Sequence, residues 1–333
     1  MSLQTPSVKD RYLGALLGMA IGDAMGIASN GLTRGEIEGR YGRIAGFLPL
    51  KDAAGNELEP AGQFSENTEL AICLAESLLT SNGFVDPATA GYRFVQVLHG
   101  PHAHFLGATT RRALERAAAS ADYQDGEGGP LSAGAGPAGR VVPVALVHAL
   151  ADLNTEVFVR EVLRSTLITH AHPAAVNGAL ASAFALRLAV RREAPPEFTI
   201  DEVLSFIDED EVAARLRVAR QLAERGDLAH ADDLDVIGTS GYIAEAVSAA
   251  LYIYARSGGD FEAAVLTAAN QGGASSTIGA ISGALCGAWV GANALPLRLI
   301  EQFDARMYLL MAAPALLRVA QQRAGLFLHL QQL

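Results

Sequence analysis

The sequence predicts an all-α protein folded as a single domain, and three observations lead to this prediction. Apolar residues recur at helical spacing along most of the 333 residues, whereas strand signals are weak throughout. Alanine is abundant and aromatic residues make up only 6% of the chain, a composition that suits closely packed helices. We find no internal repeat and no linker long enough to separate two domains, so residues 1–333 are expected to form one unit, apart from the first few.

The first half of the chain divides into helices separated by one long irregular stretch. Small residues follow one side of a helix predicted at 8–28, and a helix predicted at 66–81 carries a leucine face. Ser65 is suited to cap the second helix, because a serine hydroxyl accepts from the first free backbone N–H groups. The glycine-rich residues 30–62 are expected to form turns and short extended pieces. Further helices are predicted at 86–98, 109–120, 142–152 and 155–169.

The second half continues with helices predicted at 174–193, 201–223, 241–257, 260–270, 276–290 and 295–325. The helix from residue 276 has a glycine at every fourth position, which in a soluble chain indicates close packing against a neighbouring helix. The stretch 124–139 is the loosest, and is expected to be either a mobile loop or a binding loop. Asp232, Asp233 and Asp235 are expected in a solvated acidic loop.

Charge and cysteine content narrow the class of protein. The net charge of −11 argues against a nucleic-acid partner, because phosphates would be repelled, while a small anion held by backbone N–H groups remains compatible. Cys73 and Cys286 lie in apolar helical stretches and fit buried thiols, so a reducing, cytoplasmic location is expected. The N-terminus lacks the apolar core of a signal peptide, and no membrane association is expected.

Four loop-to-helix junctions are the candidate functional segments. They read "GDAMGIASN" at 22–30, "GQFSENTEL" at 62–70, "SAGAGPAGR" at 132–140 and "GGASSTIG" at 272–279. Each combines glycines, which let a backbone approach closely, with short polar side chains at a helix end. A single such junction is an ordinary helix start, but four of similar composition favour one shared pocket.

The order of these segments resembles the ADP-ribosylglycohydrolase family. The resemblance is carried by "RYLGALLGMAIGDAMG" at 11–26, "GQFSENTELAICLAESLL" at 62–79, "THAHPAA" at 169–175 and the stretch 261–296 that contains "GGASST". It implies a compact orthogonal bundle of helices with a central cleft. It also implies hydrolysis of an N- or O-glycosidic bond between ADP-ribose and a protein side chain, assisted by two magnesium ions.

The family's metal motifs are altered in this chain. The place of Thr-Asp-Asp-Thr is taken by "SENT" at 65–68, and Gly-Gly-Asp-x-Asp-Thr has become "GGASST" at 272–277. Asn30 stands where several members have a glutamate, and the Gly-Asn-Gly loop reads Gly134, Ala135 and Gly136. Residues that match the family frame are Asp23, Thr68, Arg140, Gly272, Gly273 and Thr277.

These replacements remove most of the negative charge that the resemblance would lead one to expect. Four family carboxylate positions hold Asn30, Asn67, Ala274 and Ser276, and only Glu66 remains acidic. Magnesium prefers carboxylate oxygens, and two adjacent dications repel each other unless several carboxylates surround them. We therefore expect no two-magnesium centre and no resident cofactor; the most that Glu66 is expected to hold is one weakly bound divalent cation.

The remaining polar residues define the predicted site. Glu66 is the candidate catalytic acid or base, and the alternative role is an N-terminal helix acid stabilised by the helix dipole. His170 and His172 are candidate proton carriers, with a structural role at a helix start as the favoured alternative, and no metal is predicted at His102 and His104. The predicted binding residues are Asp23, Asn30, Ser65, Asn67, Gly134, Gly136, Arg140, Tyr242, Gly272, Gly273, Ser275 and Ser276.

Three functional hypotheses follow from the sequence. The favoured one is a family member that binds ADP-ribose or a related ribosyl nucleotide, free or attached to a protein, with two-magnesium hydrolysis impaired or lost. The second is an active hydrolase of an N- or O-glycosidic bond that uses Glu66 with little or no metal. The third is a scaffold that binds a partner protein. The sequence does not specify an oligomeric state.

Overall fold

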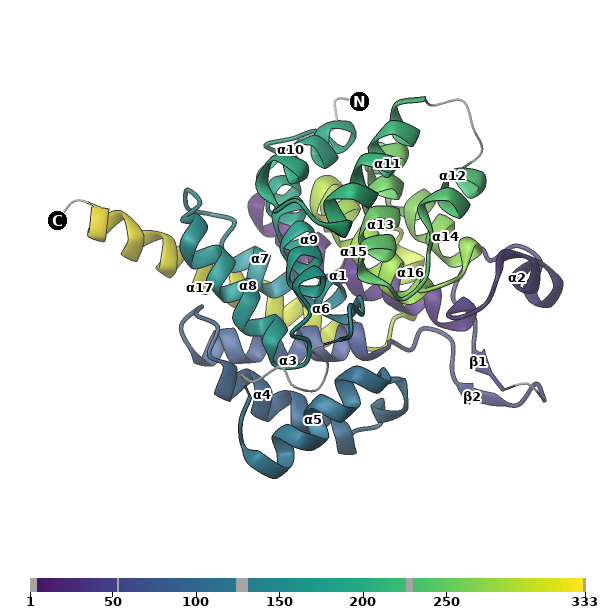
Figure 1. Ribbon diagram of the computed structural model, residues 1–333, viewed down its shortest axis with the longest axis horizontal. Helices are drawn as coiled ribbons and strands as arrows, with labels where there is room; N and C mark the ends of the chain where they lie inside the picture. The colour runs from purple at the N-terminus through teal and green to yellow at the C-terminus, as the bar shows by residue number, and fades with distance from the viewer. Residues whose placement is uncertain (1–4, 53, 124–130, 226–229, 332–333) are drawn as a thin grey trace.

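Figure 1 shows a molecule built almost entirely of helices, as the sequence predicts. The computed structural model describes residues 5–52, 54–123, 131–225 and 230–331. The α-helices within these residues are α1 (Val8–Gly26), α2 (Arg34–Tyr41), α3 (Glu66–Thr80), α4 (Pro87–Gln96), α5 (Ala108–Ser120), α6 (Gly136–Arg140), α7 (Val142–Val147), α8 (Thr155–Leu167), α9 (Pro173–Arg191), α10 (Thr199–Phe206), α11 (Glu211–Arg225), α12 (His230–Ile237), α13 (Ile243–Ser257), α14 (Phe261–Gln271), α15 (Ser275–Val290), α16 (Leu297–Gln302) and α17 (Arg306–Gln331). Short 3-10 helices are η1 (Ile27–Ser29), η2 (Val97–His99), η3 (Ala103–Phe105), η4 (Pro196–Phe198) and η5 (Ala292–Ala294), and β1 (Leu50–Lys51) pairs with β2 (Glu57–Glu59) as an antiparallel hairpin.

Helices α1 and α15 form the centre of the bundle and run antiparallel in direct backbone contact. A Cβ atom added at Gly18 would lie 2.1 Å from the carbonyl oxygen of Gly283, and one at Gly22 would lie 1.9 Å from that of Gly279. Only glycine permits this approach, since real Cβ contacts are never so short. The predicted close packing of the glycine-rich helix is therefore confirmed, with α1 as its neighbour.

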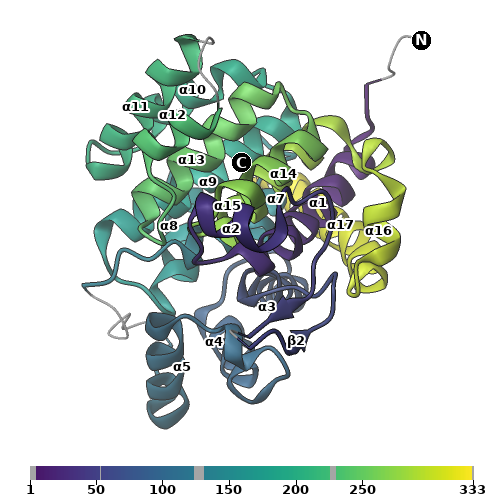
Figure 2. The ribbon, with the colours of Figure 1, turned by 90° about the vertical axis from the view of Figure 1, so that its right-hand side faces the viewer.

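The remaining helices surround this central pair in two groups. Helices α9, α13 and α14 pack against α15, and α11 covers α13 in the upper part of the molecule (Figure 1). Helices α3, α4 and α5 lie in the lower part, where both views place them (Figures 1 and 2). The C-terminal end of α1 and the N-terminal ends of α3 and α15 come together between the two groups, and this is where the pocket described below lies.

Most predicted helices are present, and two long ones are divided. The helix predicted at 201–223 breaks after Phe206, because Ile207 is extended and Asp210 caps α11 by accepting from Val212 and Ala213. The helix predicted at 295–325 breaks at the extended Phe303 between α16 and α17. The helix predicted at 142–152 ends at Val147, and α6 precedes it.

Two helices lie where the sequence predicted irregular structure. Helix α2 begins with a capping box between Thr33 and Glu36, but only Ile37 is buried, so its apolar periodicity is too weak to detect. The prediction of a solvated acidic loop at 232–235 is wrong, since these residues belong to α12. Asp233 is buried against the hydroxyl of Tyr252, and Asp235 accepts hydrogen bonds from Arg34 and Gln271, so these acidic side chains hold a helix in place. In the predicted loose segment, residues 124–130 lie outside the described residues and 136–140 form α6.

Two of the described helical segments, Val8–Ser29 and Pro173–Arg191, are long and apolar enough to cross a membrane by length and composition. In the folded molecule 94% of the first apolar window and 89% of the second are buried against other parts of the chain. Their apolar character is thus accounted for by their place in the core of the bundle.

Candidate functional site

A pocket of about 670 Å³ lies where α3, α5 and α15 begin, a volume typical of small-molecule sites. It brings together eight of the thirteen predicted site residues, contributed by all four of the predicted junctions. These residues are Asn30, Ser65, Glu66, Asn67, Gly134, Gly136, Gly273 and Ser276. The other five, Asp23, Arg140, Tyr242, Gly272 and Ser275, lie behind or beside the pocket wall rather than in its lining.

The pocket frame consists of loops 30–32, 133–135, 239–241 and 272–274, which are joined to one another by backbone hydrogen bonds. Gly31 donates to the carbonyl of Gly273 at 2.7 Å, and Gly273 donates to that of Leu32 at 2.9 Å. On its other side, Ala274 donates to the carbonyl of Thr239 at 2.6 Å. The loop 272–274 is therefore held from two sides by main-chain bonds that no side-chain substitution removes directly.

The frame continues from loop 239–241 to loop 133–135. Ala135 donates to the carbonyl of Gly241 at 3.0 Å, and Ile243 donates to that of Ala133 at 2.8 Å. Tyr242 sits in this junction at the start of α13, with its hydroxyl hydrogen-bonded to Glu211. It thus supports the frame through its backbone and does not line the pocket.

Gly272 and Gly273 are required by this arrangement. Their φ angles are +81° and +64°, a region that residues with a side chain rarely adopt. A Cβ at Gly272 would lie 2.1 Å from the carbonyl oxygen of Leu32, and one at Gly273 would lie 2.1 Å from that of Thr239. Ser275 also supports the frame, because its hydroxyl donates to the carbonyl of Gly26 at 2.8 Å.

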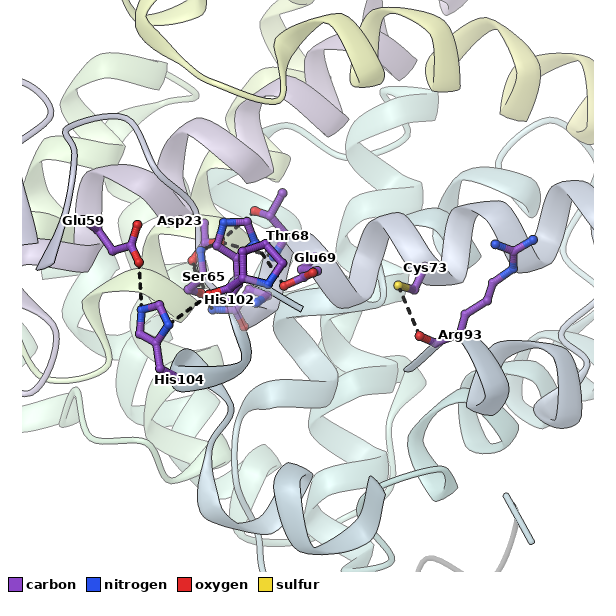
Figure 3. A network of polar contacts seen from close by, with 11 residues as sticks. Asp23, Glu59, Ser65, Thr68, Glu69, Cys73, Arg93, His102 and His104 are labelled. Atoms are coloured by element: carbon purple, nitrogen blue, oxygen red, sulfur yellow. Dashed lines mark hydrogen bonds and ion pairs between the residues drawn. The ribbon is translucent and has the colours of Figure 1, made fainter. Parts of the chain in front are cut away.

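Asp23, at the end of α1, is buried and anchors the first turn of α3 (Figure 3). Its carboxylate accepts from the backbone N–H and the hydroxyl of Ser65, at 2.9 and 2.6 Å, and from those of Thr68, at 3.2 and 2.7 Å. Burial raises the pKa of Asp23, and the hydrogen bonds from Ser65 and Thr68 act in the opposite direction. The carboxylate has its accepting capacity filled from within the protein, which makes it a supporting group for the pocket.

The pocket floor is formed by Asn30, Asn67, Ser276 and Thr277, whose uncharged side chains bond to one another. The hydroxyl of Ser276 donates to Oδ1 of Asn30 at 3.1 Å. Nδ2 of Asn67 donates to the hydroxyl of Thr277 at 3.3 Å and to Asp23 at 3.2 Å. These contacts directly connect the end of α1, the start of α3 and the start of α15.

Glu66, the first residue of α3, is the one acidic side chain in the lining of the pocket. Its Oε2 accepts from the backbone N–H of Gly107 at 2.9 Å. Burial raises the pKa of Glu66 to about 7, against the opposing effects of the Gly107 hydrogen bond and the charge of Arg140. The carboxyl group keeps some exposure because it faces the pocket, and near neutral pH it is available in both protonation states.

Arg140 lies beneath the pocket wall and is completely buried. Its Nη2 donates to the hydroxyl of Thr169 at 2.6 Å, and that hydroxyl contacts Nδ1 of His170 at 2.8 Å. Nη1 of Arg140 has no hydrogen-bond partner among the described residues, although its guanidinium lies over the ring of Phe94. A buried cation without a carboxylate partner favours negative charge nearby.

His170 lines the pocket next to Gly134. Burial and the charge of Arg140 lower its pKa to about 3, so the ring is neutral at physiological pH. Because the Thr169 hydroxyl accepts a hydrogen bond from Nη2 of Arg140, its own hydrogen can be donated to Nδ1 of His170, which leaves the ring hydrogen on Nε2 toward the pocket. His170 therefore fits a hydrogen-bond donor, whereas His172 caps α9 by accepting from Ala174 at 3.2 Å.

Several residues that line the pocket were not among the site residues predicted from the sequence. Helix α5 begins at the pocket with Gly107, Ala108, Thr109 and Thr110, and its N-terminus has no side-chain cap. Gly107 is followed by short polar residues at a helix start, which is the same signal that identified the four junctions. This signal could therefore have identified the start of α5 as part of the pocket. Phe105 and Leu50 carry no comparable signal, because an apolar residue in a wall looks like any core residue.

The chemistry of the lining suits a polar ligand with an anionic group. Helices α3, α5 and α15 all begin at the pocket, so the positive ends of three helix dipoles are directed toward it. Hydroxyl and amide side chains supply donors and acceptors for a sugar, and Glu66 is a single acid or base. No three Asp, Glu, His or Cys side chains form a metal-binding group anywhere in the described parts of the chain.

Comparisons with known proteins agree on one family. The model of the family described as ADP-ribosylglycohydrolase matches residues 4–325. The chain is 30% identical over 315 residues to the ADP-ribosyl-[dinitrogen reductase] glycohydrolase of Rhodospirillum rubrum, covering 91% of this chain and 93% of that protein. It is 30% identical to the ADP-ribosylarginine hydrolase Tri1 of Pseudomonas putida, covering 88% and 74%. A solved structure described as an ADP-ribosylglycohydrolase-related protein complex superimposes with a TM-score of 0.72 at 31% identity, over 94% of this chain and 99% of that one.

Proposed function

Because the chain belongs to the ADP-ribosylglycohydrolase family, we propose that its pocket binds ADP-ribose or a related ribosyl nucleotide and that two-magnesium hydrolysis is impaired or lost. The observation that carries this proposal is the uncharged floor. At the positions where the resemblance places metal carboxylates, Asn30 and Ser276 bond to each other and Asn67 bonds to Thr277. The frame that surrounds this floor keeps the closely packed backbone that a ligand pocket needs.

The oxygen ligands that the pocket lining offers do not fit two magnesium ions. Glu66 is the one carboxylate in the lining, and the oxygen ligands that the floor offers are neutral amides and hydroxyls already engaged with one another. Magnesium requires near-octahedral oxygen coordination and usually one or two carboxylates for each ion. One weakly held divalent cation beside Glu66 is the most that this arrangement supports.

The same pocket supports nucleotide binding without a metal. Its volume of about 670 Å³ lies within the range of pockets that bind small molecules and cofactors. A diphosphate would be stabilised by the N-terminal ends of α5 and α15, which lack side-chain caps, and by the charge of Arg140 behind the wall. Relatives of this chain are named for ADP-ribosylated proteins, so an ADP-ribosyl group on a protein is a second form in which we expect the ligand to arrive.

Calorimetric titration with ADP-ribose tests this proposal. We expect binding in EDTA with an affinity that magnesium changes by less than about threefold, because no metal is needed to organise the floor. Ala108→Trp, which fills the pocket from the exposed first turn of α5, should abolish binding. Ala118→Trp places the same side chain on the exposed far end of α5 and should bind as the unmodified protein does.

Two outcomes would contradict the proposal. Magnesium-dependent release of ADP-ribose from an ADP-ribosyl-arginine or ADP-ribosyl-serine peptide, abolished in Glu66→Gln, would show that two-magnesium hydrolysis persists. The absence of binding by ADP-ribose and by ADP-ribosylated peptides, with and without magnesium, would instead favour the scaffold role.

A second candidate function is supported by Glu66 itself. A carboxyl group with a pKa raised to about 7 can donate a proton to a leaving group at neutral pH, as acid catalysis of glycosidic cleavage requires. This hydrolase would need no metal and would lose activity as pH rises through about 7, while Glu66→Gln would be inactive at every pH. A rate that is unchanged in Glu66→Gln would exclude it.

A further inference from the structure

The pocket wall contains a segment that histidine–carboxylate pairs hold in place. Residues 100–107, called the strap here, connect η2 to α5 and pass over the start of α3. The strap supplies Phe105 and Gly107 to the pocket lining, and the Gly107 N–H is the donor to Glu66. Contacts that hold the strap in position therefore also hold the Gly107 N–H in hydrogen-bonding distance of Glu66, the one acidic residue of the pocket lining.

The first pair joins the strap to α3. Nδ1 of His102 lies 3.1 Å from Oε2 of Glu69, and both side chains are largely buried, with 10% and 18% exposed. The ring of His102 also packs against Phe64, with 4.4 Å between ring centroids. Figure 3 shows His102 and Glu69 facing each other across the gap between the strap and α3.

The second pair joins the strap to the hairpin. Nε2 of His104 lies 3.1 Å from Oε1 of Glu59 on β2, and its Nδ1 lies 3.2 Å from the carbonyl oxygen of Pro101 (Figure 3). Both ring nitrogens thus face acceptors. The ring also packs at a tilt against Phe105, a residue of the pocket lining, with 4.2 Å between centroids and 37° between the ring planes.

We propose that His102 is a positioning residue that holds the strap against α3 when protonated, and so keeps Phe105 and Gly107 in place in the pocket wall. The hold weakens as the ring loses its proton, because a charge-assisted pair becomes a neutral hydrogen bond. The consequence for a ligand rests on the proposed function of the pocket, whereas the behaviour of the strap does not.

The charges around the His102 ring act in the direction that this proposal needs. His102 faces Glu69 on α3, Glu59 on β2 and Asp304 after α16, and the hydrogen bond to Glu69 is the main cause of its raised pKa, against the effect of burial. A histidine with a raised pKa stabilises the folded arrangement fully at low pH and loses that contribution as pH rises through the raised value. His104 faces Glu59, and Arg111 ties the same turn by donating to the carbonyl of Ala103.

Glu66 titrates in the same region with the opposite effect on the strap. Its pKa is raised to about 7, and its ionisation strengthens the hydrogen bond from Gly107 as pH rises. The contribution of His102 is therefore measured as the difference between variants at one pH, and not as the slope of the unmodified protein alone.

Amide hydrogen exchange of Gly107 tests the proposal without a ligand. In His102→Gln we expect the protection factor to fall about threefold to tenfold at about pH 5.5 and to match the unmodified protein at about pH 8. His99→Gln, on an exposed position of η2 just before the strap, is the matched control and should change nothing.

Two results would overturn the proposal: equal Gly107 protection in His102→Gln and the unmodified protein at about pH 5.5, or an effect of the same size at both pH values, which would indicate a purely structural role. A parallel ADP-ribose titration separates this proposal from the proposed function. If ADP-ribose does not bind but the exchange difference appears, the strap proposal stands and the assignment of the ligand fails.

Discussion

The two ends of the α1–α15 pair differ in what they require from the sequence. Along most of their length the helices touch through glycines, and a Cβ at Gly14 or Gly18 would lie 2.1 Å from a carbonyl oxygen of the other helix. At the pocket end side chains are added to this contact: the Ser275 hydroxyl donates to the Gly26 carbonyl, and the Ser276 hydroxyl donates to Asn30, which follows α1 and η1. The first region depends on the absence of side chains alone, and the second also on which side chains are present.

The comparison separates the contacts that fix the shape of the pocket from the side chains that set its chemistry. The glycine contacts and the backbone bonds of the frame fix the positions of the loops, and neither depends on the charge of the floor. Direct hydrogen bonds between Asn30 and Ser276, and between Asn67 and Thr277, connect the loops across the floor of the pocket. We therefore expect the fold to respond strongly to changes in the packing and weakly to magnesium.

The largest effect is expected for a side chain placed between the helices. Gly18→Ala would place a methyl group 2.1 Å from the carbonyl oxygen of Gly283, so α1 and α15 must separate. We expect a loss of at least about 4 kcal/mol in the free energy of unfolding, or failure to fold. Gly35→Ala on α2 is the matched control, because a Cβ there meets nothing within 4 Å, and chemical denaturation should show no loss.

Removing the charge of Asp23 is expected to have the next largest effect. In Asp23→Asn the NH2 half of the side-chain amide would face the hydrogen-bond donors of either Ser65 or Thr68. These buried donors would then have no acceptor. We expect the free energy of unfolding to fall by about 3 kcal/mol, together with weaker binding of any ligand that contacts the first turn of α3. A variant as stable as the unmodified protein would show that Asp23 does not anchor this turn.

A methyl group in the pocket frame should have a smaller and more local effect. Gly273→Ala combines a φ of +64° with a Cβ 2.1 Å from the Thr239 carbonyl, whereas Gly31→Ala has a φ of +80° with no atom within 4 Å. We expect Gly273→Ala to lose about 2 kcal/mol more than Gly31→Ala, with the difference due to the close approach alone. Equal losses in thermal denaturation would mean that loop 272–274 moves freely.

The smallest effect on stability is expected for Glu66→Gln, and its sign depends on pH. Because the pKa of Glu66 is raised in the folded protein to about 7 from 4.5, the native state binds more protons and stability falls as pH rises between these values. Glu66→Gln should therefore be more stable than the unmodified protein above about pH 7, by roughly 1–2 kcal/mol once solvent in the pocket is considered. A parallel pH dependence of the two proteins would contradict the raised pKa.

The sequence predicted the frame better than the wall. Glycine spacing in the helix from 276 and four polar helix starts identified the centre of the fold and one side of the pocket, because both signals depend on backbone geometry. Sequence could not distinguish Ser276, whose hydroxyl lies in the floor, from Ser275, whose hydroxyl is buried on Gly26, since adjacent residues of one helix turn face different directions. Phe105 reaches the pocket from a segment that carries no functional signal in the sequence, and only the packing of the bundle reveals it.

The most direct test of the account is a magnesium titration of the unmodified protein beside a variant with carboxylates restored at all four positions, Asn30→Glu, Asn67→Asp, Ala274→Asp and Ser276→Asp. Calorimetry and thermal denaturation would follow binding in each. We predict that the variant binds magnesium and gains thermal stability from it, because the frame is intact, while the unmodified protein shows neither effect. Stoichiometric binding of two ions by the unmodified protein would contradict the account.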